Sequence, residues 1–382
     1  MSHTPDERLT ELRDHIDTVD GELIELLARR RDLVASVADR KIDLGLPVYA
    51  PDREEAMFNN RRADAEEHGV APDLVEDLLR RIMRESYSAE SARGFRCVVD
   101  HPLPIVLIGG QGQMGRLFHR AFTASGYEVR VLELDDWDNA ADIFAGAGLV
   151  VIGVPIAATA AVIESCRSVI PPDAVLADIT SLKTAPIQAM LDAHPGPVVG
   201  LHPMFGPTVG SLAKQVVVCC HGRGEEQYSW LLDQIRTWGA TVVDVDSETH
   251  DRHMGIIQAL RHFATFVYGT HLMEENVDLQ QVLAMSSPIY RLELAMVGRL
   301  FAQDPDLYAD IIFGSSEGPV LAGRYHERFQ SALDIYRTGD REEFREQFRN
   351  VSEWFGPLAE LFLDESSTLL DQVRDRMNGA ER

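Results

Sequence analysis

The sequence predicts a multidomain protein in which a central α/β domain lies between two all-helical regions. The chain has 382 residues, more than a single hydrophobic core usually organises. Apolar residues recur at helical steps of three and four near the N-terminus, gather in short runs in the middle, and return to helical spacing afterwards. We therefore expect an all-helical domain at 1–92, a linker at 93–103, an α/β domain at 104–246 and a helical domain at 247–382.

Composition limits the partners and the location. The chain has 61 acidic and 36 basic residues, only three of them lysines, for a net charge of −25. Nucleic acids and anionic lipids need a basic surface, so neither is expected as a partner. No apolar stretch reaches the length of about 18 residues that spans a membrane. The polar start at Met1–Arg13 shows no signal peptide, and the four cysteines lack metal or redox spacing, so we expect a cytoplasmic protein.

The N-terminal region predicts three helices. Thr4-Pro5-Asp6-Glu7 has the pattern of a capping box with proline in the first turn. A long amphipathic helix follows and is broken by Gly45-Leu46-Pro47. A short helix is expected from Asp52, and a third over 72–92.

Charged residues fall on the apolar faces of these helices. Arg30 and Lys41 continue the apolar ladder of the first helix, while Ser86 and Glu90 continue that of the third. Burying unpaired charges costs several kcal/mol, so something must compensate. The sequence supports equally an internal ion-pair network and a polar pocket for a small dianion.

The central region predicts buried, mostly parallel strands connected by helices. The expected strands are 105–108, 127–132, 149–154, 174–179, 197–201, 215–220 and 240–245.

A glycine motif follows the first strand. Gly110-Gln111-Gly112-Gln113-Met114-Gly115 matches GxGxxG and opens a helix, as in the dinucleotide-binding turn of a Rossmann domain. Glu133, at the end of the next strand, is expected to take the ribose hydroxyls, and this acidic end favours NAD over NADP. Val154 and Pro155 follow the third strand and are candidates to lie along the cofactor, although an ordinary strand end is nearly as plausible.

A histidine motif lies near the fifth strand. His202, in Gly200–Pro207, is expected just past the strand, where a neutral imidazole could remove a proton, or could instead cap a turn. Ser181 could orient His202, and Lys183 could hold a substrate carboxylate or a cofactor oxygen. Lys214, in the loop that follows, could be only a solvated cation.

The C-terminal helices carry a third group of polar residues and long apolar segments that could bury a dimer interface. His250 and His253 have a spacing that a metal could use, but no further ligands frame them, so no metal is expected. Arg291 and Arg299 flank an apolar face and need an anionic partner, either Glu293 or a substrate carboxylate.

Together these motifs closely resemble the bifunctional chorismate mutase–prephenate dehydrogenases of bacterial tyrosine synthesis. The resemblance runs through nearly the whole chain, with the mutase first. The segments that carry it are 12–14, 80–88, 110–118, 200–207 and 286–301.

For the mutase, the resemblance implies a pocket that holds dianionic chorismate and stabilises charge on its ether oxygen, forming prephenate without covalent catalysis. Arg13 would reach in from a partner subunit of a homodimer. Glu90 would donate to the ether oxygen only when protonated, so we predict mutase activity that falls as Glu90 ionises. The implied substrate-binding residues are Arg13, Arg30, Arg53, Glu54 and Ser86, and the catalytic ones are Lys41 and Glu90.

For the dehydrogenase, the resemblance implies oxidative decarboxylation of prephenate with NAD⁺ to 4-hydroxyphenylpyruvate, CO₂ and NADH. His202 would accept the proton of the ring hydroxyl, and Ser181 would align it. Lys183 and His262 would line the pocket, and Arg299 would bind a substrate carboxylate. Tyrosine, shaped like the product, is a candidate feedback inhibitor.

One departure from the family pattern is Gly318-Pro319, which falls where relatives continue a helix and should break or shift it.

Two other functions stay open at this point. One is an arogenate dehydrogenase with a degenerate mutase region, although retention of Arg30, Lys41 and Glu54 disfavours it. The other is a non-catalytic NAD-binding regulator.

Overall fold

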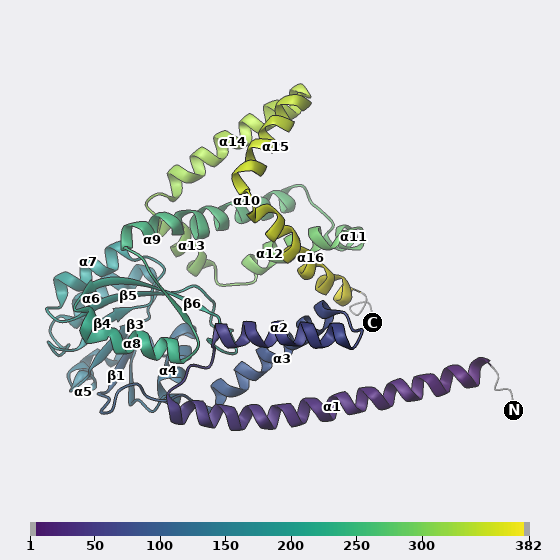
Figure 1. Ribbon diagram of the computed structural model, residues 1–382. Coiled ribbons are helices and arrows are strands. Elements are labelled where there is room, and N and C mark those ends of the chain that lie inside the picture. Colours follow the sequence, from purple (N-terminus) through teal and green to yellow (C-terminus); the bar gives the residue numbers. More distant parts are fainter. Residues whose placement is uncertain (1–4, 378–382) are drawn as a thin grey trace. The chain divides into compact units, whose positions relative to one another are not determined.

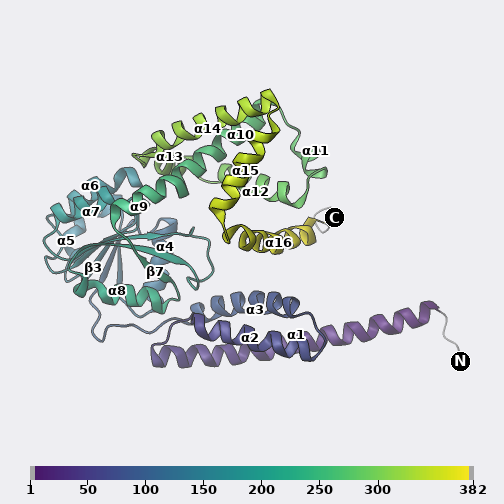
Figure 2. The ribbon, with the colours of Figure 1, turned by 45° about the horizontal axis from the view of Figure 1, so that its top comes forward.

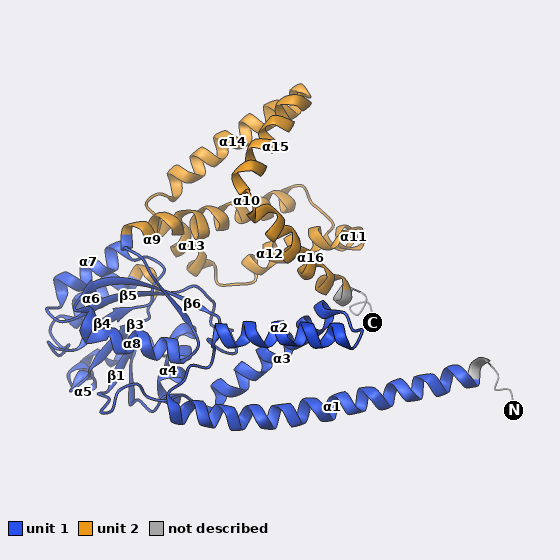
Figure 3. Cartoon of the chain, in the orientation of Figure 1, with its two compact units in different colours: residues 1–154, 158–247 blue, residues 155–157, 248–382 orange. Residues whose placement is uncertain are grey.

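The computed structural model describes residues 5–377 and divides into two compact units. Unit 1 comprises residues 1–154 and 158–247, and unit 2 comprises residues 155–157 and 248–382 (Figure 3). Unit 1 thus holds both the N-terminal helices and the α/β domain, which the sequence predicts as separate domains. The predicted capping residue Thr4 lies outside the described residues.

Three helices form the N-terminal region, as predicted. Both later helices have proline in their first turn, and the first ends at Leu44, just before Gly45, whose φ of +68° suits glycine. Figures 1 and 2 both show the first half of α1 running beyond the other two helices. The helices are α1 (Pro5–Leu44), α2 (Pro51–Glu67) and α3 (Pro72–Arg93).

The α/β domain has one seven-stranded sheet in the order β2-β1-β3-β4-β5-β6-β7. Every neighbouring pair is parallel except β5 and β6, which are antiparallel. The carboxyl ends of β1 to β5 therefore meet at one edge. The strands are β1 (Ile105–Ile108), β2 (Val129–Leu132), β3 (Leu149–Ile152), β4 (Val175–Asp178), β5 (Val198–Pro203), β6 (Val216–Arg223) and β7 (Thr241–Asp244).

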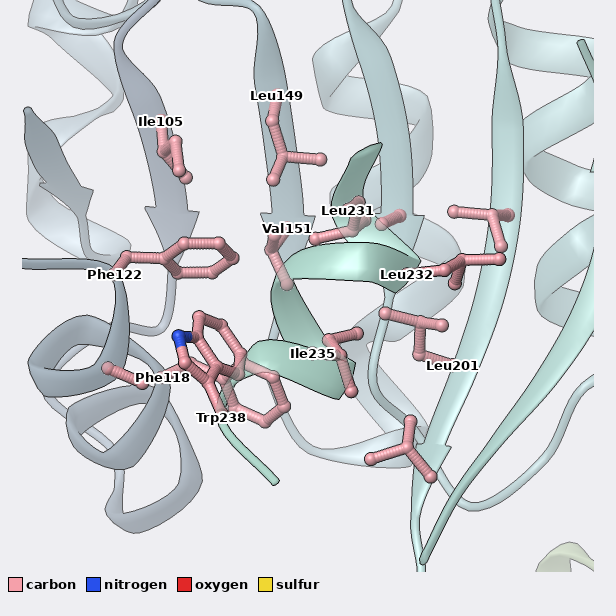
Figure 4. Packing of buried hydrophobic residues seen from close by; sticks show 14 of the residues in the cluster. Ile105, Phe118, Phe122, Leu149, Val151, Leu201, Leu231, Leu232, Ile235 and Trp238 are labelled. Atoms are coloured by element: carbon pink, nitrogen blue, oxygen red, sulfur yellow. The ribbon is translucent and has the colours of Figure 1, made fainter. Parts of the chain in front are cut away.

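Helices cover the sheet on both faces, which is why its central strands are continuous apolar runs. On one face, Phe122 of α4 packs edge-on against Trp238, with ring centroids 4.9 Å apart (Figure 4). The connecting helices are α4 (Gln113–Ala124), η1 (Leu134–Asn139), α5 (Ala140–Phe144), α6 (Ile156–Cys166), α7 (Thr184–Ala193) and α8 (Glu225–Thr237).

The predicted linker is hydrogen-bonded to the α/β domain. The side-chain amide of Gln234, fully buried in α8, donates to the carbonyl of Arg96 and its oxygen accepts from the backbone N–H of Val98. The same oxygen accepts the hydroxyl of Tyr127 at 2.9 Å. The segment after α3 is therefore an ordered part of unit 1.

Unit 2 is helical, as predicted. Gly318 and Pro319 open α14 after a break that follows Gly314, so the expected interruption is present and proline occupies a first-turn position. The apolar-rich segment at 254–272 contains a π-helical segment, η2. The elements are α9 (Ser247–Met254, whose first residue belongs to unit 1), η2 (Gly255–Leu260), α10 (Arg261–Glu274), α11 (Leu279–Ala284), α12 (Pro288–Phe301), α13 (Pro305–Gly314), α14 (Gly318–Thr338), α15 (Arg341–Phe355) and α16 (Leu358–Met377).

Among the described residues, none of the helices combines the length and the apolarity that crossing a membrane requires.

Candidate functional sites

The glycine motif forms a tight turn between β1 and α4. A side chain at Gly115 would place its Cβ 2.2 Å from the carbonyl oxygen of Gly109, so only glycine fits. Gly112 is the N-cap of α4 and provides no side-chain cap, which leaves the first backbone N–H groups of the helix available to an anion. The turn therefore fits the pyrophosphate of a dinucleotide.

Glu133 and Val154 lie beside this turn. Glu133 follows β2, and its Oε1 accepts the backbone N–H of Gln111 at 2.7 Å. A carboxylate oxygen has more than one lone pair, so Glu133 can also accept ribose hydroxyls. A Cβ at Gly109 would lie 3.1 Å from Cγ1 of Val154, which places Val154 against the motif. Pro155, predicted beside it, belongs to unit 2.

His202 is the penultimate residue of β5, whereas the sequence predicted a position just past the strand. It is 3% exposed and is paired in register with Val218 of β6. β5 runs parallel to β4, which runs parallel to β3, so His202 ends its strand at the same edge as the glycine turn.

Lys183 differs from its prediction as a pocket-lining residue. It is fully buried, forms an ion pair with Asp178 and donates to the carbonyl of Leu201 at 2.8 Å. With no exposed surface, its ammonium is not available to a substrate carboxylate in this arrangement. The backbone carbonyl that it binds immediately precedes His202, so Lys183 supports the strand end that carries this histidine.

Ser181 is half-buried in the loop after β4. Within residues 5–377, the structure gives no hydrogen bond from Ser181 to His202. The Asp178 carboxylate, at the end of β4, accepts the backbone N–H of Thr180 at 3.0 Å and its hydroxyl at 2.5 Å. The alignment of His202 by Ser181 stays a prediction.

Two predicted dehydrogenase residues lie in unit 2. The His262 ring meets Tyr308 edge-on at 4.9 Å, and burial, with a smaller effect of Arg261, lowers the pKa of His262 to about 4. Arg299 is exposed in the last turn of α12. Among the described residues it forms no ion pair with Glu293, so that alternative partner is not used.

Four predicted mutase residues meet in two pairs within the N-terminal helices. Arg30 donates to the hydroxyl of Ser86 at 2.7 Å, joining α1 to α3. Lys41 forms an ion pair with Glu90 at 2.7 Å and also donates to the carbonyl of Val48 at 2.8 Å. Glu90 is 6% exposed. These charges are therefore brought to one interior, where they partner each other.

Glu54 forms the centre of a further cluster that the sequence did not reveal. It is 7% exposed, accepts the hydroxyl of Tyr87 and forms an ion pair with Lys214. The Lys214 ammonium also lies 5.2 Å from the ring centroid of Tyr49. Lys214, whose side chain is 39% exposed, therefore has a buried carboxylate as a partner besides solvent. It lies 160 positions from Glu54, in another predicted domain, so no local pattern could have identified the pair.

Arg13 and Arg53 are not brought into these clusters. Both are exposed. Arg13 precedes Arg30 by 17 positions on α1, which corresponds to roughly 25 Å along a helix. Arg13 therefore cannot share a site with Arg30 of the same chain.

The described residues contain one group with metal-ligating side chains close together, Cys219, His221 and Asp244. The imidazole lies 3.2 Å from the Asp244 carboxylate and 2.8 Å from the Tyr228 hydroxyl. Burial, with smaller effects of the neighbouring acids, raises the pKa of Cys219 to about 12. In this structure these side chains form a hydrogen-bonded cluster. None of the four cysteines forms a disulfide.

Three family models match consecutive parts of the chain. They are chorismate mutase type II over residues 12–91, the nucleotide-binding domain of prephenate dehydrogenase over 126–244, and the dimerization domain of prephenate dehydrogenase over 246–350.

Relatives match over almost the full length. The T-protein of Enterobacter agglomerans is 54% identical over 96% of this chain and 98% of its own. The T-protein of Haemophilus influenzae is 48% identical over 98% of this chain and 99% of its own. A structure of Aquifex aeolicus prephenate dehydrogenase in complex with hydroxyphenyl propionate and NAD⁺ matches with a TM-score of 0.54 and 17% identity, over 67% of this chain and 97% of that one. At this identity the last match supports the fold.

The order of the matched domains and the identity over nearly the full chain agree with the two groups of side chains described above. The chain therefore belongs to the T-protein family of bifunctional enzymes, with a chorismate mutase followed by a prephenate dehydrogenase.

Proposed function

We propose that the dehydrogenase of this chain oxidises prephenate with NAD⁺ and that His202 is its base. One observation carries this proposal: the buried His202 ends its strand at the edge where the glycine turn follows β1 and Glu133 follows β2. Ligands of open α/β sheets bind at the carboxyl ends of the strands. NAD⁺, when bound there, accepts a hydride.

The chain's own residues move the proton. The imidazole of His202 accepts a hydrogen bond from the ring hydroxyl of prephenate. It then takes the hydroxyl proton while the hydride leaves the ring carbon that bears this hydroxyl. Loss of CO₂ leaves its electron pair in the resulting dienone, which becomes an aromatic phenolate, and the imidazolium of His202 returns the proton to give 4-hydroxyphenylpyruvate. Lys183, paired with Asp178, holds the end of β5 through its hydrogen bond to the carbonyl of Leu201. Ser181 aligns the imidazole once substrate is present.

The helical unit supplies the contacts to the rest of the substrate. The guanidinium of Arg299 binds a carboxylate of prephenate, for which a planar bidentate donor is well suited. A pKa of about 4 keeps His262 neutral near pH 7. His262 therefore offers a hydrogen bond without adding charge to the pocket.

The mutase site is proposed to hold chorismate between α1, α2 and α3. Arg30, Ser86 and Arg53 face the substrate carboxylates, Lys41 and Glu90 meet the ether oxygen, and Glu54 accepts the ring hydroxyl. The ion pair with the buried Glu90 supports the role of Lys41, because it holds the ammonium in place and a prearranged donor stabilises developing charge without reorganising.

The complete mutase is proposed to be a homodimer in which Arg13 serves the partner's site. The first half of α1 exposes a stripe of large apolar side chains and carries Arg13 too far from Arg30 to act in its own chain. A second copy would cover this stripe. The exposed apolar residues of that half are Leu9, Leu12, Ile16, Val19, Leu23 and Ile24.

We further propose a cytoplasmic location and inhibition by tyrosine. Free thiols at all four cysteines suit a reducing compartment. Tyrosine shares the ring and side-chain length of the dehydrogenase product. Added tyrosine should lower NADH formation, and cell fractionation should recover the enzyme with cytoplasmic markers.

The decisive test of the dehydrogenase proposal is NADH formation with two substrates. Purified protein and NAD⁺ should give NADH with prephenate and much less with arogenate, whose side chain replaces the keto group by an amine. Preference for arogenate would refute the substrate assignment. Binding of NAD⁺ without NADH formation from either substrate would indicate a regulator.

A further inference from the structure

The loop between β5 and β6, residues 204–215, contacts the N-terminal helices. The hydroxyl of Ser211 lies 2.8 Å from that of Ser91 in α3. A Cβ at Gly210 would meet the hydroxyl oxygen of Ser88 at 3.0 Å. The nucleotide-binding domain of the dehydrogenase therefore packs closely against a helix of the mutase.

Lys214 is the residue of this loop that reaches a charged partner. Its Nζ forms an ion pair with Oε1 of Glu54 and lies 5.2 Å and 5.9 Å from the ring centroids of Tyr49 and Tyr87. Tyr87 in turn donates to the other carboxylate oxygen of Glu54. The ammonium thus lies among two aromatic rings and a buried carboxylate, all supplied by the mutase helices and the segment before α2.

The backbone at Lys214 is held in an unusual conformation. Its φ of +64° lies in the left-handed region, which side-chain-bearing residues rarely adopt and glycine adopts readily. The backbone N–H donates to the carbonyl of Gly239 at 3.0 Å, and the neighbouring Ala213 is buried against Val48 and Tyr87. A lysine kept where glycine would be easier points to a function for its side chain.

We propose that Lys214 is a positioning residue for the mutase reaction, supplied by the dehydrogenase part of the chain. This rests on the proposed function of Glu54 as acceptor of the chorismate hydroxyl. With one oxygen held by Lys214 and the other by Tyr87, the carboxylate is fixed in orientation. Each oxygen keeps a lone pair for the substrate. The mutase site is therefore completed by the nucleotide-binding domain.

The test compares full-length variants. Lys214→Met keeps the apolar stem and the same backbone preference but removes the charge, and Lys214→Arg restores a cation. Ser211→Ala is the matched control, since it removes the contact to Ser91 and the hydrogen bond that Ser211 accepts from the backbone of Ala213, without touching Glu54. Mutase kcat and KM, dehydrogenase kcat and the melting temperature are measured for each.

Lys214→Met should lower mutase kcat/KM by roughly 10-fold or more, the effect expected for losing a hydrogen bond to a charged group. Dehydrogenase kcat should stay unchanged, Lys214→Arg should recover part of the mutase loss, and Ser211→Ala should retain mutase activity. In the double variant with Glu54→Gln, removing Lys214 should cause no further loss, because both changes act through one carboxylate.

Two results would overturn the inference and separate it from the proposed function. If Glu54→Gln lowers mutase activity but Lys214→Met does not exceed Ser211→Ala, or if the two losses multiply in the double variant, Lys214 does not act through Glu54. If Glu54→Gln itself has no effect, the proposed function of Glu54 fails, and the positioning role fails with it.

Discussion

The first half of α1 and the central sheet differ in how far their apolar side chains are exposed. On α1, Leu12 is 53% and Ile16 is 59% exposed, whereas Ile105 and Leu149 in the sheet are fully buried. Apolar burial drives folding, and a large exposed apolar surface marks an interaction site. The central sheet thus buries its apolar residues within one chain, whereas the first half of α1 leaves them open to a partner, as the proposed homodimer requires.

This difference extends to the chemistry. The residues assigned to NAD⁺ and proton transfer are positioned by one sheet and its loops, so they need nothing beyond the chain to lie at the same edge. The residues assigned to chorismate come from α1, α2, α3 and, through Lys214, from the next domain. Variants of the two sites should therefore differ in whether a second subunit can rescue them.

The largest effect is expected for His202→Asn. Asparagine keeps a polar side chain of similar reach but cannot accept a proton, so dehydrogenase kcat should fall by about 100- to 10,000-fold. NAD⁺ affinity, measured by calorimetry, and mutase activity should be retained. A variant that forms NADH at the normal rate would refute the base assignment, and mixing it with another inactive dehydrogenase variant tests whether subunits complement.

The second prediction concerns Arg13 and the subunit exchange that it implies. Arg13→Ala should lower mutase kcat/KM by roughly 100-fold, because it removes a charge-assisted contact to a carboxylate. Lys41→Ala should be inactive as well. Mixed dimers of the two variants should regain activity, since one of their two sites would contain both residues intact. Mixtures that stay inactive although subunits have exchanged would place Arg13 outside the partner's site.

Periodicity predicted most of the fold because its physical causes are local. The steps of three and four along α1, the glycine turn before α4 and the short apolar runs of β1, β3 and β4 all appear where expected. The antiparallel β6 was not predicted, because an apolar run does not encode its direction. His202 was placed just past its strand because strand ends are set by pairing with β6 rather than by local sequence.

Long-range pairing explains the errors at the sites. The sequence predicts Lys183 to be a pocket cation. In the structure it is buried, pairs with Asp178, five residues away, and donates to the carbonyl of Leu201. The partner of Lys214 could not be identified from the sequence because Glu54 lies in a different predicted domain. Residue type and spacing identify charged side chains but do not show which of them packing will bring together.

The third prediction tests the helical unit. Arg299→Gln should raise the KM for prephenate by roughly 10-fold with little change in kcat, because the lost contact serves binding rather than proton transfer. Steady-state NADH formation at varied prephenate measures both constants. Arg291→Gln, on the same helix, is the matched control and should have a smaller effect. An equal rise in both variants would indicate a general effect of charge rather than a specific contact.

The smallest effect, and the one that best probes the mutase interior, is expected for Glu90→Gln. A protonated Glu90 can donate to the ether oxygen, whereas the ionised form, paired with Lys41 at 2.7 Å as in this structure, can only accept. Activity of the natural chain should therefore be highest at acidic pH and fall as pH rises. Glutamine donates at every pH, so its profile should be flat and should exceed that of the natural chain by a few-fold only at the alkaline end. Glu54→Gln changes another buried carboxylate of the same site and should leave the slope in place. If Glu90→Gln keeps the slope, the titrating group is not Glu90, and the ion pair with Lys41 is then the form that acts on chorismate.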